Sequence, residues 1–90
     1  MKITATATMN GENKVTVRIS AAFQGMENAN GNAQAAARDS FKASFADAIA
    51  VGFIWNMASM AYEATCLATP EACAPFAAYV EKKGLEIIQM

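Results

Sequence analysis

One stretch limits what this chain can fold into. Residues 48–62 read AIAVGFIWNMASMAY, fifteen consecutive positions without a charged side chain in a chain of 90 residues. The residues on both sides of it include many alanines, the best helix formers. The pattern predicts a long helical segment from about residue 33 to residue 67. Unbroken, that helix would be about 50 Å long, which is more than a domain of this size spans. We therefore expect a bend or break at Asp39–Ser40 or at Gly52, or a helix that projects toward a partner.

Placed at helical spacing, the apolar residues of this segment fall on three stripes rather than one. The stripes are Phe41, Phe45, Ala48 and Gly52; then Val51, Trp55, Ala58 and Tyr62; and then Phe53, Met57, Met60 and Ala64. A helix that is apolar on all sides must be buried on most of them. A small sheet and a short second helix would cover two stripes. The third is then left for an interface with another molecule.

Most residues expected at that interface are aromatic or methionine, the types enriched in the cores of protein interfaces. They are Val51, Phe53, Trp55, Met57, Met60 and Tyr62. The expected partner is another protein, a second copy of this chain, or both, bound through residues 48–64. The alternative is a monomeric core, in which the second helix and the loop at 24–34 cover the third stripe.

The first part of the chain predicts a β-hairpin. Residues 3–9, ITATATM, alternate strictly between apolar side chains and threonine, and the alternation resumes in residues 14–23. This period of two is typical of half-buried strands. Asn10 and Gly11, between the two runs, tolerate the positive φ angles of a tight turn.

Residues 69–84 carry the start and stop signals of a second helix. Thr69 suits the N-cap, Pro70 the first helical position and Gly84 the residue just past the end. Pro75 does not fit, because it lacks the N–H that a helix interior uses. The final residues, 85–90, are short and β-branched, and they predict a third strand.

Together these elements predict an α+β fold in a single domain, residues 1–90. The expected architecture is a small three-stranded sheet, made of the hairpin and the C-terminal strand, in the order ββααβ. One face of that sheet, with Ile3, Val15, Val17 and Ile19, would be covered by the long helix and the short second helix.

Composition excludes several classes of function. Seven basic and eight acidic residues give a net charge of −1, whereas a nucleic-acid binder normally carries a basic face. The chain has no histidine, the commonest general base and metal ligand, and we expect no metal and no cofactor. The first residues lack the apolar core of a signal peptide, and the uncharged stretch is shorter than the roughly 18–20 residues of a membrane span. We expect a cytoplasmic protein without direct contact to nucleic acid or membrane.

Four charged residues are candidate polar contacts for a partner: Arg18, Arg38, Asp39 and Lys42. Arg18 lies among the threonines on the outer face of the hairpin, where its fork of donors would suit a partner's acceptors. The other three lie on the early part of the long helix. The competing interpretation is that all four are solvated surface residues, since exposed ion pairs contribute only about 0–1 kcal/mol.

Cys66 and Cys73 lie seven positions apart across the Thr69–Pro70 corner. Free cysteine is among the most buried residue types, and the cytosol keeps thiols reduced, so structural thiols are expected first. A disulfide that joins the two helices is the alternative. A zinc site is less favoured, because two thiolates without histidine are too few ligands.

No catalytic, metal-binding or nucleotide-binding pattern stands out, which favours a non-enzymatic protein-binding module. In size and in its mix of helices and strands, the chain is similar to some anti-CRISPR and related anti-defence proteins. That similarity implies an inhibitor of phage or mobile-element origin that acts by covering a surface of a host complex. Two alternatives remain: a homo-oligomeric structural or accessory subunit assembled through the apolar helix, and a small carrier of an apolar ligand.

Overall fold

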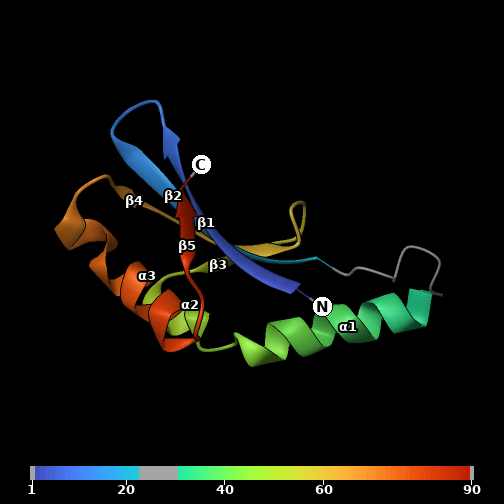
Figure 1. Cartoon of the computed structure of the whole chain (residues 1–90). Helices are drawn as coiled ribbons and strands as arrows, with labels where there is room; N and C mark the ends of the chain where they lie inside the picture. Colours follow the sequence, from blue (N-terminus) through green and yellow to red (C-terminus); the bar gives the residue numbers. More distant parts are fainter. Residues whose placement is uncertain (1, 23–30, 90) are drawn as a thin grey trace.

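The described part of the chain forms five strands and three helices, in the order ββααββαβ (Figure 1). The computed structural model describes residues 2–22 and 31–89. The elements are β1 (Lys2–Asn10), β2 (Lys14–Ala22), α1 (Gly31–Ser44), α2 (Ala48–Val51), β3 (Ile54–Asn56), β4 (Ala61–Leu67), α3 (Pro70–Lys82) and β5 (Ile87–Gln89).

The strands form one mixed sheet in the order β3-β4-β2-β1-β5. β1 and β2 are antiparallel, with Ala5 opposite Ile19. β4 runs antiparallel to both β2 and β3, so that Tyr62 lies between Ile19 on one side and Trp55 on the other. β5 pairs parallel with β1, with Ile87 opposite Ala5. The first and last strands of the chain are therefore neighbours.

The expected three-stranded sheet is wrong, because the sheet has five strands. The hairpin and the C-terminal strand are both present, and β1 lies between β2 and β5. The two additional strands, β3 and β4, come from the segment that was expected to be helical. They extend the sheet beyond β2, on the side away from β5.

The long helix at 33–67 is also wrong. α1 ends at Ser44, α2 is a single turn, and the chain leaves its helical path at Gly52, where φ is 124°. Gly52 was one of the two expected break points, whereas Asp39–Ser40 lies inside α1. Residues 61–67 form a strand because Tyr62, Ala64 and Cys66 alternate with Glu63 and Thr65, a period of two. The alanines in this region fit either structure, and packing against β2 decides between them.

The hairpin and the second helix are confirmed. Residues 11–13 connect β1 to β2, and the left-handed residue of this turn is Asn13, with φ at 60°, rather than Gly11. In α3, the Thr69 side chain accepts a hydrogen bond from the Ala72 N–H, as an N-cap does. The helix continues through Pro75 without a break.

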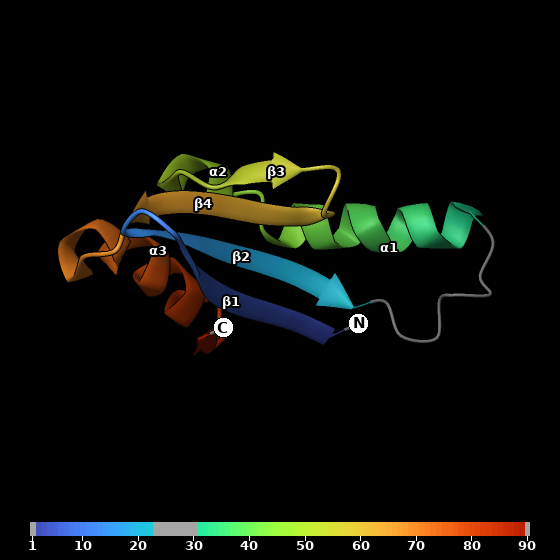
Figure 2. The same ribbon diagram turned by 90° about the horizontal axis from the view of Figure 1, so that it is seen from above.

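All three helices lie on one side of the sheet (Figures 1 and 2). Between the helices and the sheet lies a core that is rich in aromatic side chains. The Phe41 ring centroid is 6.0 Å from those of Trp55 and Tyr62, and the Phe53 ring lies 5.2 Å from that of Phe76. Residues of all three apolar stripes are thus buried together, since Phe41, Tyr62 and Phe53 belong to one stripe each.

The molecule is elongated, with extents of 42 × 25 × 20 Å. The first part of α1 projects past the ends of β1 and β2 in both views (Figures 1 and 2). Phe41 is the first fully buried side chain along the described part of this helix. Of the loop expected at 24–34, residues 24–30 lie outside the described residues, and residues 31–34 belong to α1.

Candidate functional site

The sheet has one face that the helices do not cover (Figure 2). We call it the outer face. The pairing register places on it the side chains of Thr4, Thr6, Thr8, Thr16, Arg18, Glu63, Thr65, Ile54, Asn56 and Ile88. Most of these side chains are polar and partly or fully exposed. The outer face is therefore open to contact with another molecule.

A polar network joins three strands across the outer face. Arg18 on β2 pairs with Glu63 on β4, directly opposite in the register. The other carboxylate oxygen of Glu63 accepts a hydrogen bond from Asn56 Nδ2 at 2.9 Å. Ser59 Oγ donates to Glu63 as well, at 3.1 Å. Glu63 is thus held by three donors, which fixes the position of its carboxylate.

These donors lower the pKa of the Glu63 carboxyl below its ordinary value of 4.5. The hydrogen bond from Asn56 is the largest cause, and those from Arg18 and Ser59 act in the same direction, while burial opposes them. Glu63 is therefore ionised at neutral pH. With Arg18 beside it, the network presents one positive and one negative group.

Asn56 has a second role in the turn from β3 to β4, residues 57–60. Its Oδ1 atom accepts hydrogen bonds from the backbone N–H groups of Ala58, at 2.9 Å, and Ser59, at 3.4 Å. The turn ends at Met60, which has a left-handed φ of 53°. That conformation is uncommon for a side chain of this size. Asn56 therefore holds both the Glu63 carboxylate and the turn beside it.

A groove of about 510 Å³ lies along β3, on the side where β4 continues past Ile54, the first residue of β3. We call it the β3 groove. It is lined by Gly52, Ile54, Trp55, Asn56, Met57, Glu63, Ala64 and Thr65. Two of the lining side chains are apolar and strongly exposed: Ile54 at 71% and Met57 at 73%. The groove therefore combines an apolar rim with the charged group of Glu63.

The six residues expected at an interface lie in three different environments. Phe53 and Tyr62 are core residues, only 1% and 2% exposed. Val51, Trp55 and Met60 are half-buried, and Met57 is exposed. They do not share one helical stripe, because the segment that carries them is a helical turn and a pair of strands. Trp55 and Met57 line the β3 groove.

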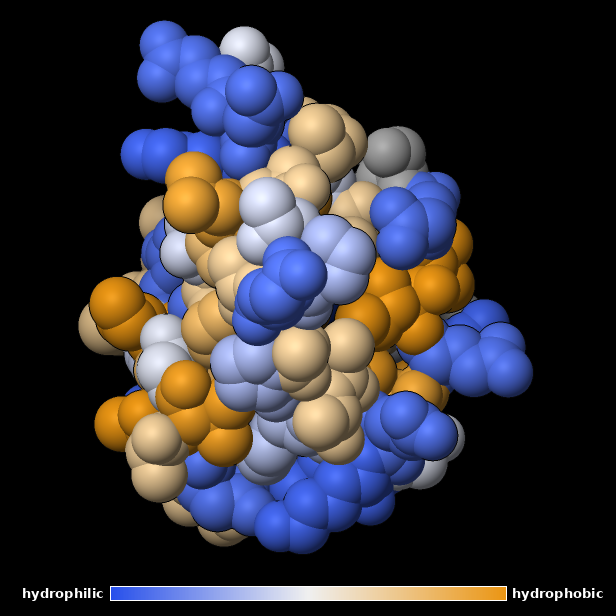
Figure 3. All heavy atoms as spheres, turned by 90° about the vertical axis from the view of Figure 1, so that its left-hand side faces the viewer, coloured by the Kyte–Doolittle hydropathy of each residue, from blue (hydrophilic) through white to orange (hydrophobic). Residues whose placement is uncertain are grey.

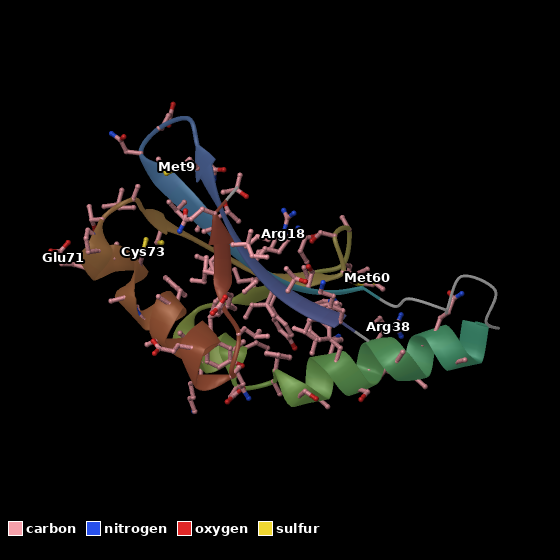
Figure 4. The ribbon with its side chains drawn as sticks, in the orientation of Figure 1. Met9, Arg18, Arg38, Met60, Glu71 and Cys73 are labelled. Carbon is pink, nitrogen blue, oxygen red and sulfur yellow. The ribbon has the colours of Figure 1, made fainter. Side chains whose placement is uncertain are left out.

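The four expected polar contacts do not come together, and Figure 4 shows Arg18 at the sheet and Arg38 beside α1. Arg18 lies on the outer face, whereas Arg38 and Asp39 form an ion pair of 3.4 Å on α1, on the helical side of the sheet. Lys42 lies with its Nζ atom 4.9 Å from the centroid of the Trp55 ring, in a cation–π arrangement. Arg18 and Lys42 each contact a residue that lines the β3 groove, Glu63 and Trp55 respectively.

A second polar cluster joins α3 to the turn before α2. Tyr79 donates a hydrogen bond to Asp47 at 2.6 Å, and Lys83 Nζ lies 3.2 Å from the same carboxylate oxygen. Burial and the Asp47 carboxylate raise the pKa of the Tyr79 hydroxyl, while the Tyr79 hydrogen bond and Lys83 lower that of Asp47. The tyrosine thus stays protonated as a donor. The cluster connects elements of the fold, and neither Tyr79 nor Asp47 lines the β3 groove.

Several kinds of site are not found in residues 2–22 and 31–89. No three Cys, Asp or Glu side chains in this part of the chain come close enough together to hold a metal ion. None of the described helices has the length and apolar character needed to cross a membrane.

Sequence reasoning missed the roles of Asn56 and Glu63. Both lie in the segment that was expected to be helical, and neither was named as a candidate site residue. The signal that identifies them is the alternation around Glu63, because a charged residue between Tyr62 and Ala64 is typical of a strand with one open face.

Surface hydropathy gives further detail on the side of the molecule with the start of α3 and the β1–β2 turn (Figure 3). In this view, hydrophobic side chains lie in separate groups with hydrophilic side chains between them.

Comparisons with protein families, with curated proteins and with solved structures find no match to this chain.

Proposed function

We propose that the protein is a non-enzymatic protein-binding module that holds its partner at the β3 groove and on the adjacent outer face. The observation that carries this proposal is the contrast between neighbouring side chains in residues 53–57. Phe53 is buried in the core, while Ile54 and Met57 are more than two-thirds exposed beside the groove. Large apolar side chains that line a groove are typical of a contact that a partner completes.

The edge of the sheet supports the same proposal. β3 is only three residues long, and β4 continues past it for four residues, 64–67. Among the described residues, no strand pairs with these four on that side. Edge strands present backbone N–H and C=O groups that another chain can pair with. An extended segment of a partner protein would add a strand here, with its side chains against Ile54 and Thr65.

The network on the outer face supplies the polar part of the contact. The Arg18 side chain is about half exposed, at 47%, and its guanidinium can form further hydrogen bonds at its free edge. Because Glu63 already balances its charge, the surface selects partners by the position of their hydrogen-bond acceptors more than by net charge. This agrees with a chain whose net charge is only −1.

The proposal extends to a way of acting, which is occlusion of a surface on a host complex, as an anti-defence inhibitor does. Its support is the chain's size and mixed make-up, together with an open sheet face and no metal cluster in the described residues. Efficiency of plating tests it. Phage would be plated on host strains with defined defence systems that express wild type, Ile54→Asp or Met9→Asp. Rescue by wild type and Met9→Asp, with loss in Ile54→Asp, supports inhibition through the β3 groove.

A homodimer is the second candidate, and the same edge strand favours it. Two copies of β3 could pair around a twofold axis, which would cover Ile54 and Met57 on both. Light scattering at micromolar concentration distinguishes the two. A mass of twice 9.5 kDa that falls to 9.5 kDa in Ile54→Asp would support self-assembly, and a monomer in both would exclude it.

Site-directed photo-crosslinking tests the proposed surface itself. A photoreactive amino acid would be placed at position 54 in one variant and at position 9 in the control. Met9 is a suitable control because it is also exposed, at 57%, but lies at the far tip of the hairpin. We expect one specific crosslinked protein from position 54 in host cells and none from position 9. Equal patterns from both positions would contradict the proposal.

A further inference from the structure

We propose that Cys66 and Cys73 form a redox modification site, at which a low-molecular-weight disulfide of the glutathione type converts the two thiols into an intramolecular disulfide. This inference is independent of the proposed function, because neither residue lines the β3 groove. It concerns how β4 is joined to α3.

The geometry brings the two thiols together from different elements. Cys66 lies near the end of β4, opposite Val15 of β2, and Cys73 lies in the first part of α3 (Figure 4). Their Sγ atoms are 3.3 Å apart, and both cysteines are free. A disulfide bond is about 2.0 Å long, so the sulfurs must approach by only about 1.3 Å. Side-chain rotation covers such a distance without refolding.

Both cysteines are partly exposed, so a small disulfide can reach them. The Cys73 thiol also lies 3.4 Å from the backbone carbonyl oxygen of Leu67, to which it donates. Within the described residues, no third cysteine or carboxylate completes a metal site around the pair. Oxidation is therefore the chemistry that this pair of side chains fits best.

The two cysteines take different parts in the reaction. Burial is the main cause that raises the pKa of the Cys66 thiol to about 11, and the neighbouring Cys73 adds to it. Cys66 is thus protonated at neutral pH, and the first attack falls to Cys73. Once Cys73 is part of a mixed disulfide, it no longer carries a negative charge beside Cys66. This removes one of the causes that keep Cys66 protonated.

The exchange balances without a further oxidant. The Cys73 thiolate attacks one sulfur of the small disulfide, forms a mixed disulfide with it, and releases the first small thiol. Cys66 then gives its proton to solvent and attacks the Cys73 sulfur, which forms the Cys66–Cys73 bond and releases the second small thiol. The protein loses two hydrogens, and the small disulfide is reduced to two thiols.

The new bond would tie the end of β4 to the start of α3. α3 contributes Tyr79 and Val80 to the core, so its attachment affects the stability of the whole fold. A cross-link of this kind restricts the unfolded chain. We expect the oxidised form to melt about 10 °C above the reduced form, from the closure of a loop this short in a domain of this size.

Redox titration with mass spectrometry tests the inference. The reduced full-length protein would be equilibrated with mixtures of reduced and oxidised glutathione, quenched with a maleimide, and weighed intact. We expect the doubly alkylated species to give way to an unalkylated one that has lost two hydrogens, without a lasting glutathione adduct. Persistent adducts, or two free thiols in the most oxidising mixture, would overturn the proposal, as would a disulfide-linked dimer.

Single-cysteine variants test the order of attack. Cys66→Ser and Cys73→Ser each retain one thiol and cannot form the internal bond, so each should stop at a glutathione adduct. The adduct should form about tenfold more slowly in Cys73→Ser, because the raised pKa of the remaining Cys66 leaves less of it as the reactive thiolate. Equal rates in the two variants would contradict the assigned order. Circular dichroism of each variant confirms that it is folded.

Discussion

The Tyr79 hydroxyl donates a hydrogen bond of 2.6 Å to the Asp47 carboxylate, although the two residues are 32 positions apart in the chain. This bond connects α3 to the turn between α1 and α2. It lies within the segment that the sequence predicted to be helical, between the two positions at which a break was expected. Asp47 is the residue just before α2, so this bond joins the start of α2 to α3.

Removal of this bond should lower stability in a pH-dependent way. Tyr79→Phe keeps the ring in the core but leaves Asp47 without its strongest donor, and we expect the melting temperature at about pH 7 to fall by roughly 5 °C. The folded state lowers the pKa of Asp47 below its ordinary value of 3.8. The contribution of the Asp47 carboxylate to the stability of the fold is therefore present above that pH, and it is lost as the pH falls through the folded-state pKa.

Thermal unfolding followed by circular dichroism between about pH 7 and pH 2 checks this prediction. The gap between wild type and Tyr79→Phe should narrow as the solution becomes more acidic than 3.8, where Asp47 becomes protonated. A gap that stays constant over this range would show that the hydroxyl acts without the charge of Asp47.

Gly52→Ala distinguishes the observed fold from a helix at this position, because the two predict changes of opposite sign in the free energy of unfolding. In a helix interior the substitution would stabilise the protein by about 1 kcal/mol. In this structure Gly52 has a φ of 124°, and an added Cβ would lie 3.2 Å from the Phe76 ring. We expect a loss of about 1–2 kcal/mol in the free energy of unfolding.

Gly11→Ala is the matched control for this measurement. An added Cβ at Gly11 would have no atom within 4 Å, and its φ lies outside the left-handed range. Urea titration should show a change of less than about 0.5 kcal/mol for this variant. A stabilised Gly52→Ala protein would mean that the chain continues as a helix through that position.

Truncation of Phe53 and of Met57 should have very different effects, although the sequence placed both on one stripe. Phe53 is 1% exposed and Met57 is 73% exposed. We expect Phe53→Ala to cost about 3–5 kcal/mol in the free energy of unfolding, and Met57→Ala about 0.5 kcal/mol or less. Chemical denaturation measures both. Equal losses would contradict the assignment of one to the core and the other to the groove.

Asn56→Ala should raise the pKa of Glu63 toward its ordinary value of 4.5, because the hydrogen bond from Asn56 is the largest cause of the lowering. NMR titration of the Glu63 carboxyl carbon measures this directly, and Arg18→Ala should produce a smaller rise. Wild type loses the contribution of Glu63 as pH falls below 4.5 and through the folded-state pKa. In Asn56→Ala this loss should be smaller and should be complete at a higher pH. An unchanged Glu63 titration would show that Asn56 does not hold the carboxylate.

Met60→Gly should leave the fold intact and raise its stability by up to about 1 kcal/mol, because glycine adopts the φ of 53° at this position without steric cost. Met60→Ala, which keeps a Cβ, is the control and should bring no such gain. Differential scanning calorimetry measures both. A destabilised glycine variant would show that packing of the Met60 side chain outweighs the conformational cost.

The hairpin, α3 and β5 could be predicted from sequence because their signals are local. The strict alternation in residues 3–9 fits only the period of two that a strand has. Thr69, Pro70 and Gly84 mark the ends of α3 because each residue type favours the backbone conformation found at its position. Such signals do not depend on what the rest of the chain does.

Residues 45–67 could not be predicted in the same way. Their alanines and methionines fit a helix or a strand, and the choice depends on whether β2 offers an edge to pair with. The count of apolar stripes assumed a helix, in which apolar side chains on every side must be buried against other elements. Strands place alternate residues on opposite faces, so Tyr62 enters the core while Glu63 faces out. The residues expected at the interface therefore lie on a helical turn and two strands, and not on one helix.

The parallel pairing of β1 with β5 has a consequence for biosynthesis. β1 is made before β5, the strand that pairs with its other edge. Until β5 has been synthesised, that edge of β1 is unpaired. Ribosome-bound chains of this protein should thus be prone to associate with one another until β5 is complete.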